Sequence, residues 1–193
     1  MTLTKLPAII RRSDLARLGL TLHELYAMRK AGELEQIAPG TYLRPGELDD
    51  TTATLAAIAL RKPDATICLL TALSLHELTD EIPQATDLAL SRGERTLKAT
   101  FAPIRWHSFD PQTFQIGRRT HTVIDEIAIG LYGPERTIID AFRLRHEFGA
   151  DLAHEALKRW LRRPGNNASE LLTMAKAFPK ARPALQTALE ILL

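Results

Sequence analysis

The chain has 193 residues, of which 45% are hydrophobic, and its formal net charge is +2. This apolar content can form one sizeable core or two smaller ones, which excludes an intrinsically disordered chain. The small net charge excludes a uniformly basic nucleic-acid coat, so any affinity for DNA must come from local patches. Lys and Arg outnumber Asp and Glu in residues 1–46 and 141–193, whereas acids prevail in residues 47–140.

The single cysteine, Cys68, lies in the apolar run TICLLTAL, where we expect a buried hydrophobic side chain. One cysteine cannot form a disulfide within the chain, which suits a reducing compartment. The sequence shows no signal-peptide pattern and no apolar run of membrane-spanning length. We therefore expect a cytoplasmic protein with no membrane partner.

The first 46 residues carry the pattern of a winged helix-turn-helix. Gly19 can end a short first helix, because glycine readily adopts the left-handed conformation. Thr21 and Glu24 then form the sequence signature of a capping box at the start of a second helix. The segments ELEQI and TYLR, joined by Ala-Pro-Gly, predict a small hairpin after it. This order predicts a DNA-binding domain over residues 1–46.

The second helix separates an apolar face from a face suited to a DNA groove. On a helical wheel, the outward face consists of His23, Ala27 and Lys30, and Tyr26 lies at its edge. Polar donors can contact base acceptors or phosphates, and a small methyl group permits close approach to the groove. An ordinary short surface helix would show the same face. The residues around the helix must therefore distinguish a DNA-binding helix from an ordinary one.

Basic and polar residues on both sides of this helix favour DNA. Arg11 and Arg12 precede the helix pair, where a first element can contact backbone phosphates. Thr41 and Arg44 lie beside the hairpin turn, as the residues of a wing do. Any one arginine taken singly is better explained as a solvated charge. The residues predicted to contact DNA are Arg11, Arg12, Thr21, His23, Tyr26, Ala27, Lys30, Thr41 and Arg44.

Residues 47–193 predict a second domain of mixed composition. A helical pattern covers residues 51–61, and the run TICLLTALSLHEL predicts a buried helix. Four short alternating segments follow, TDLALS, PIRWHSF, THTVID and IAIGLY, and the last two form a plausible hairpin. From Pro134 onward the pattern is helical. The predicted fold class is therefore α+β, an N-terminal winged helix-turn-helix followed by a C-terminal domain of helices and a small antiparallel sheet.

The sequence lacks the motifs of the common catalytic and metal sites. Four His-Glu dipeptides occur, but none has the second histidine four residues on that a helical zinc site requires. No acidic residue is followed two positions later by lysine, as a metal-dependent nuclease would need, and no phosphate-binding loop or nucleophile elbow is present. We therefore predict no enzymatic activity, no catalytic residue, no metal and no cofactor.

A basic cluster near the C-terminus has more than one interpretation. It contains Lys158, Arg159, Arg162 and Arg163 around Trp160. A charged helix end with an inward-packed tryptophan explains it structurally, because cations complement the helix dipole there. A second DNA contact and a surface for an acidic partner are the functional alternatives.

The string SDLARLGLTLHELYAMRKAGELEQIAPGTYLRP resembles the winged-helix head of the AbiEi antitoxins of type IV toxin–antitoxin systems, an abortive-infection group in phage defence. The resemblance continues through ICLLTALSLHELTDEIP, PERTIIDAFR and ARPALQTALEILL. It implies a head that binds inverted repeats in double-stranded DNA at its own promoter and represses it. It also implies a C-terminal domain over residues 47–193 that counteracts a nucleotidyltransferase-like toxin without a stable complex.

The resemblance assigns the DNA-facing roles to residues of the head. They fall on Arg11, Arg12, His23, Tyr26, Lys30, Thr41 and Arg44. The recognition helix carries less charge than many such heads, which bears on base specificity. The alternative function is a stand-alone winged-helix regulator whose C-terminal domain senses a ligand or mediates dimerisation. An adjacent nucleotidyltransferase reading frame would distinguish the two.

Overall fold

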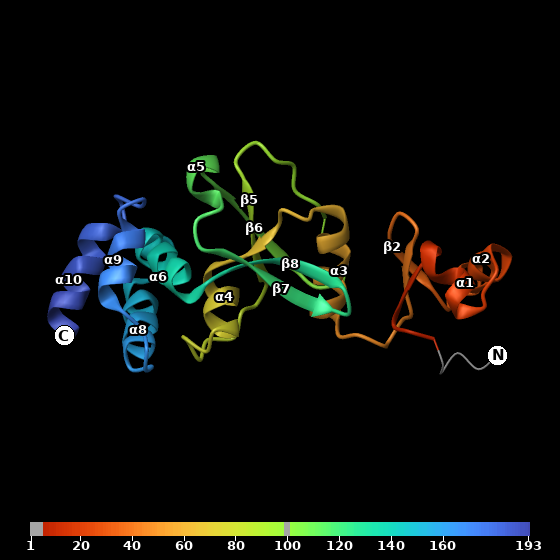
Figure 1. The fold of residues 1–193 in the computed structure, drawn as a ribbon, viewed down its shortest axis with the longest axis horizontal. Helices are drawn as coiled ribbons and strands as arrows, with labels where there is room; N and C mark the ends of the chain where they lie inside the picture. The colour runs from red at the N-terminus through yellow and green to blue at the C-terminus, as the bar shows by residue number, and fades with distance from the viewer. Residues whose placement is uncertain (1–5, 99–100) are drawn as a thin grey trace.

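The computed structural model describes residues 6–98 and 101–193 (Figure 1). Three parts follow one another along its long axis: a small N-terminal head, a central sheet with helices, and a C-terminal group of helices. The head comprises a three-stranded sheet and two helices. Its elements are β1 (Ile9–Arg11), a 3-10 turn (Arg12–Asp14), α1 (Leu15–Leu18), α2 (Leu22–Lys30), β2 (Glu35–Ala38) and β3 (Thr41–Leu43).

The helix-turn-helix forms for the local reasons that the sequence predicts. Gly19 ends α1 in the left-handed conformation, with φ of 66°, and its N–H bonds to a carbonyl of the last turn. Thr21 and Glu24 form the capping box at the start of α2. The hairpin β2–β3 follows, and β1, which the sequence pattern does not predict, pairs with β3 to give the antiparallel order β1-β3-β2.

The two faces of the head's sheet bury different cores. Ile10 and Tyr42 pack with the helices of the head. Their neighbours Ile9 and Leu43 point to the opposite face, because side chains alternate along a strand, and there they join the core around the helix α3 (Asp50–Arg61). The head is therefore attached to the rest of the chain by buried apolar surface.

A five-stranded sheet in the order β6-β5-β4-β8-β7 forms the centre of the molecule. Its strands are β4 (Thr66–Ile67), β5 (Thr86–Ser91), β6 (Ile104–Phe109), β7 (Arg118–Ile124) and β8 (Ile127–Tyr132). The predicted hairpin β7–β8 is confirmed. The sheet is mixed, however, because the pairs β4–β8 and β5–β6 are parallel, whereas we expected antiparallel strands throughout.

This difference arises from two connections that the local pattern does not reveal. After β5 the chain returns to the end of the sheet at which β5 begins. The next strand, β6, therefore runs parallel to β5. The run TICLLTALSLHEL was expected to be one helix. Instead it contributes the two-residue strand β4 and only then the helix α4 (Leu69–Leu75). A strand this short carries no periodicity of its own.

Helices cover both faces of the central sheet. The helix α3 (Asp50–Arg61) packs on one face against Leu88 and Ile129. The other face carries Ala89, Phe109 and Tyr132 and is covered by α4 and α5 (Pro111–Phe114). Cys68 lies in this second layer and is fully buried, as predicted, and burial raises the pKa of its thiol.

The C-terminal helices form the last part of the molecule. They are α6 (Pro134–Arg143), α7 (Arg145–Phe148), α8 (Ala150–Leu161), α9 (Ala168–Ala175) and α10 (Arg182–Leu192). A continuous helix was expected after Pro134, but the helix is interrupted at Leu144, between α6 and α7. The α+β fold class is confirmed. Throughout residues 6–98 and 101–193, every helix is too short or too polar to cross a membrane.

Candidate nucleic-acid interface

The helix α2 presents the outward face that the wheel predicts. His23, Ala27 and Lys30 are exposed, while Leu25 on the opposite side is fully buried in the core of the head. Tyr26 lies between these faces with 46% of its surface exposed. The helix thus keeps a polar strip free on a scaffold that its apolar side holds in place, which is the arrangement a recognition helix needs.

Thr21 acts as a cap for this helix. Its hydroxyl accepts a 3.2 Å hydrogen bond from the backbone N–H of Glu24, and it donates a 2.8 Å bond to the Glu24 carboxylate. That carboxylate also accepts a 2.7 Å bond from the Thr21 N–H. These bonds favour the ionised acid and lower the pKa of Glu24. Because its hydroxyl is engaged twice, Thr21 supports the recognition helix from within the chain.

Arg12 lies beside the turn of the wing. Its backbone N–H donates a 2.7 Å hydrogen bond to the carbonyl of Gly40, which adopts a left-handed φ of 69° between β2 and β3. The Arg12 side chain is exposed. The fold therefore places the positive charge of Arg12, which precedes the helix pair, beside the turn of the wing. These two positions are distant in the sequence.

Two residues predicted to contact DNA from the wing have structural roles instead. Thr41 pairs with Arg11 and Ala38 in the head's sheet, and only 6% of its surface is exposed. The Arg44 side chain, 12% exposed, donates a 2.7 Å bond to the carbonyl of Leu6 and forms a 2.8 Å ion pair with Glu47. Both side chains are engaged within the chain in this conformation, and their contact with DNA stays a prediction.

Arg11 is paired with an acid of the central domain. Its guanidinium group lies 3.2 Å from the carboxylate of Glu126, which belongs to the turn between β7 and β8. The structure therefore divides the predicted DNA contacts. The strip of α2 and Arg12 remain available, whereas Arg11 is engaged by the central domain.

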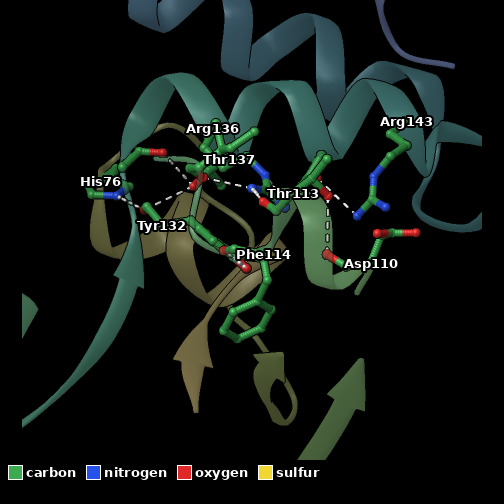
Figure 2. Close-up of polar contacts among 11 residues, drawn as sticks. His76, Asp110, Thr113, Phe114, Tyr132, Arg136, Thr137 and Arg143 are labelled. Carbon is green, nitrogen blue, oxygen red and sulfur yellow. Dashed lines mark hydrogen bonds and ion pairs between the residues drawn. The ribbon is translucent and has the colours of Figure 1, made fainter. Parts of the chain in front are cut away.

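A second polar cluster, which the sequence analysis did not assign, surrounds Arg136 in α6 (Figure 2). Arg136 is fully buried and donates a 2.9 Å hydrogen bond to Asp140. It also donates to the carbonyls of Thr113 and Ile116 at 2.6 and 2.7 Å. Its guanidinium carbon lies 4.2 Å from the centre of the Tyr132 ring. One side chain thus ties α6 to the end of α5 and to the central sheet.

Asp140 is shared between two guanidinium groups. Arg143 lies 3.0 Å from its second oxygen, at ion-pair distance but outside hydrogen-bond geometry. Burial raises the pKa of the Asp140 carboxyl, and the two arginines oppose that shift. The segment PERTIIDAFR places Arg136, Asp140 and Arg143 at helical spacing. This spacing predicts that the three side chains lie on one face of the helix.

A third group of charges lies on β5 and β6. Asp87 is fully buried, and its carboxylate lies 2.8 Å from Nε2 of His107 and 3.7 Å from Arg105. A hydrogen bond at this position requires the proton of the His107 ring on Nε2. The aromatic rings of Phe109 and Phe148 flank the imidazole. Within the described residues, no three His, Cys, Asp or Glu side chains are grouped as a metal site would require.

The basic cluster near the end of α8 is only partly available. Arg159 is bound by Asp80 and Glu155, and the Trp160 side chain is buried, as the structural interpretation predicts. The bonds from Arg159 lower the pKa of both acids. Lys158 and Arg162 remain exposed beside them.

Comparisons with known proteins bear on the head and on the fold. Residues 6–45 match the family model described as a transcriptional regulator, AbiEi antitoxin. The whole chain is similar to the crystal structure of the RV2827C protein from Mycobacterium tuberculosis, with a TM-score of 0.53 and 16% sequence identity. The similarity covers 95% of this chain and 76% of that one, and it shows a common fold. A comparison with curated proteins finds no match.

The matched segment spans all the elements of the head, from the residues before β1 to the end of the wing. The resemblance inferred from the string SDLARLGLTLHELYAMRKAGELEQIAPGTYLRP is thereby confirmed. Residues 6–45 of this chain are thus similar to the AbiEi antitoxin family of transcriptional regulators.

Proposed function

We propose that this protein binds double-stranded DNA at inverted repeats in its own promoter and represses it. The observation that carries the proposal is the free polar face of α2, held on a capped helix within a domain that is similar to the AbiEi family. The proposed contacts are His23, Tyr26, Ala27 and Lys30 in the major groove and Arg12 on the backbone. A strip with one lysine offers few charges, so base contacts and the second repeat must supplement the phosphate contacts.

The proposed division of the chain places DNA binding in residues 1–46 and the antitoxin function in residues 47–193. The first five residues of the proposed head lie outside the described ones. Because Ile9 and Leu43 are buried against the core around α3, we propose that the two parts keep a constant relative position when DNA binds. Binding experiments should therefore use the full chain.

We propose that the protein is also the antitoxin of a type IV toxin–antitoxin system in phage defence. It would act in the cytoplasm, and its functional partner would be a nucleotidyltransferase-like toxin encoded alongside, which it counteracts without forming a stable complex. The family match of the head supports this proposal, and the fold shared over 95% of the chain is compatible with it. The absence of enzymatic activity in this protein stays a prediction.

DNA binding is tested by fluorescence anisotropy with a labelled fragment from upstream of the protein's own reading frame. The full-length protein should bind it with an affinity that decreases as salt rises. Lys30→Ala should weaken binding and reduce the salt slope by about 0.9 if Lys30 neutralises one phosphate. Lys180 is exposed in the segment between α9 and α10, two helices that lie at the opposite end of the molecule from the head (Figure 1). Lys180→Ala is the matched control and should bind as the wild type does. No binding by the wild-type protein at low salt would overturn the DNA-binding proposal.

The antitoxin role is tested by growth. Expression of the adjacent toxin should arrest growth, and co-expression of the full chain should restore it. Lys30→Ala should still restore growth, because the substitution lies in the head. Continued arrest in the presence of the full chain would overturn the antitoxin proposal and favour a stand-alone regulator.

A further inference from the structure

The head and the central domain meet at a pair of opposite charges. Arg11 comes from β1 in the head, and Glu126 comes from the tip of the β7–β8 hairpin, 115 positions later in the chain. Nη1 of Arg11 lies 3.2 Å from the Glu126 carboxylate. Glu126 keeps 86% of its side-chain surface exposed, and Arg11 keeps 33%. Water and salt ions can therefore reach the pair, and another anion can compete for the arginine.

Buried residues on both sides hold this pair in place. Ile127 directly follows Glu126, and it belongs to the same apolar core as Ile9 of the head. Asp125 has a positive φ of 48°, which turns the chain sharply before Glu126. The carboxylate is thus brought to Arg11 by the packing of the hairpin against the head, and the contact does not depend on a flexible loop.

The two charges border a cleft of about 660 Å³ between the head and the hairpin tip. Arg11, Arg17 and Asp14 line it from the head, and Asp125 and Glu126 line it from the hairpin. The charged side chains that line the cleft from the hairpin are therefore all acidic. On the head side Asp14 lies 3.7 Å from Arg17, whereas Arg11 forms its ion pair with Glu126 of the hairpin.

We propose that the tip of the β7–β8 hairpin is an internal competitor for DNA, in which the Glu126 carboxylate takes the place of a phosphate on Arg11. This inference rests on the proposed DNA binding of the head. A carboxylate and a phosphate accept the same kind of hydrogen bond from a guanidinium group, so the two anions compete for Arg11. The contact removes Arg11 from the DNA-binding surface and keeps the affinity of the full chain low.

The proposal makes the effect of Arg11 depend on Glu126. In the wild-type protein Arg11 is already paired, so Arg11→Gln should change the dissociation constant for DNA by less than about twofold. Glu126→Gln keeps the size of the side chain but removes the charge that holds Arg11. It should tighten binding by about twofold to fivefold, the range of an exposed ion pair, and steepen the salt dependence by about 0.9.

The double variant separates competition from a general loss of negative charge. If the gain in Glu126→Gln comes through Arg11, then Arg11→Gln added to it should return the affinity to that of Arg11→Gln alone. If Glu126 merely repels DNA at a distance, the gain should persist in the double variant. Glu81→Gln removes an exposed acid from another part of the chain and should leave the affinity unchanged.

All five proteins are measured by anisotropy on the upstream fragment and on a short mixed-sequence duplex, and circular dichroism confirms that each is folded. A gain in Glu126→Gln that Arg11→Gln abolishes on both duplexes supports the competitor. Binding by the wild-type protein without that coupling overturns the competitor and leaves the proposed function intact. No binding by any of the proteins overturns the proposed function, and the competitor with it.

Discussion

The guanidinium group of Arg136 donates a 2.9 Å hydrogen bond to the carboxylate of Asp140, and neither side chain is exposed. The pair lies one helical turn apart on α6 and faces the rings of Tyr132 and Phe178. Because Arg143 approaches the same carboxylate, one acid balances two cations in a region with little water. A buried carboxylate thus neutralises the arginines at the junction between the central sheet and the C-terminal helices.

Asp140→Asn should destabilise the protein strongly. The substitution keeps the shape of the side chain but leaves two guanidinium groups close together without their anion. Breaking a buried ion pair in this way costs about 3–5 kcal/mol in the free energy of unfolding. Urea unfolding followed by circular dichroism measures the change.

Asp80→Asn is the matched control for this prediction. Asp80 also binds an arginine, Arg159, but 87% of its side-chain surface is exposed to water. Its loss should leave the urea midpoint almost unchanged, because water replaces the lost partner. Equal effects of the two substitutions would contradict the role assigned to burial at Asp140.

Thr21→Ala should loosen the start of the recognition helix. The substitution removes the hydroxyl that accepts from the Glu24 N–H, and loss of such a cap costs about 1 kcal/mol in the free energy of unfolding. Thr21→Ser keeps the hydroxyl and should restore most of the stability. Urea unfolding compares the three proteins, and an alanine variant as stable as the wild type would show that the capping box does not support α2.

The free energy of unfolding should decrease as the pH falls through the range in which His76 takes up a proton. Burial lowers the pKa of His76 below its ordinary value of 6.5, although Nε2 lies 2.8 Å from the carbonyl of Tyr132. The unfolded chain therefore binds more protons at this position than the folded one, and stability must rise with pH. The contribution of His76 is complete above its ordinary pKa and is lost as the pH falls through the lowered one.

His76→Gln keeps a hydrogen-bond donor but cannot take up a proton. As the pH falls below the ordinary pKa of histidine, its free energy of unfolding should decrease less than that of the wild type. His146→Gln, at an exposed position on α7, should follow the wild-type curve. A steeper decrease in His76→Gln than in the wild type would contradict the predicted direction of the pH dependence, which follows from the burial of His76.

Thr41→Val should leave DNA affinity unchanged. The Thr41 side chain is buried within the head, and valine has nearly the same shape, so the DNA-facing surface stays the same. Lys30→Ala, measured beside it by anisotropy, should weaken binding. A loss in Thr41→Val equal to that in Lys30→Ala would show that Thr41 contributes to DNA binding despite its burial.

The local features of the head could be predicted from the sequence because each depends on neighbouring residues. Gly19 ends α1, Thr21 and Glu24 cap α2, and the spacing of Leu25 sets which side of α2 is buried. The exposed strip of His23, Ala27 and Lys30 follows from that spacing alone. The same holds for the β7–β8 hairpin, where two alternating segments lie on either side of a short turn.

The tertiary structure alone decided which charges are free. The sequence does not distinguish Arg11, Arg12 and Arg44. In the folded chain Arg11 forms an ion pair with Glu126 and Arg44 forms one with Glu47, whereas Arg12 is exposed beside the wing. Their partners are chosen by the packing of strands and turns, which for Arg11 joins residues far apart in the chain. The mixed order of the central sheet has the same origin, because strand pairing depends on contacts that no local pattern records.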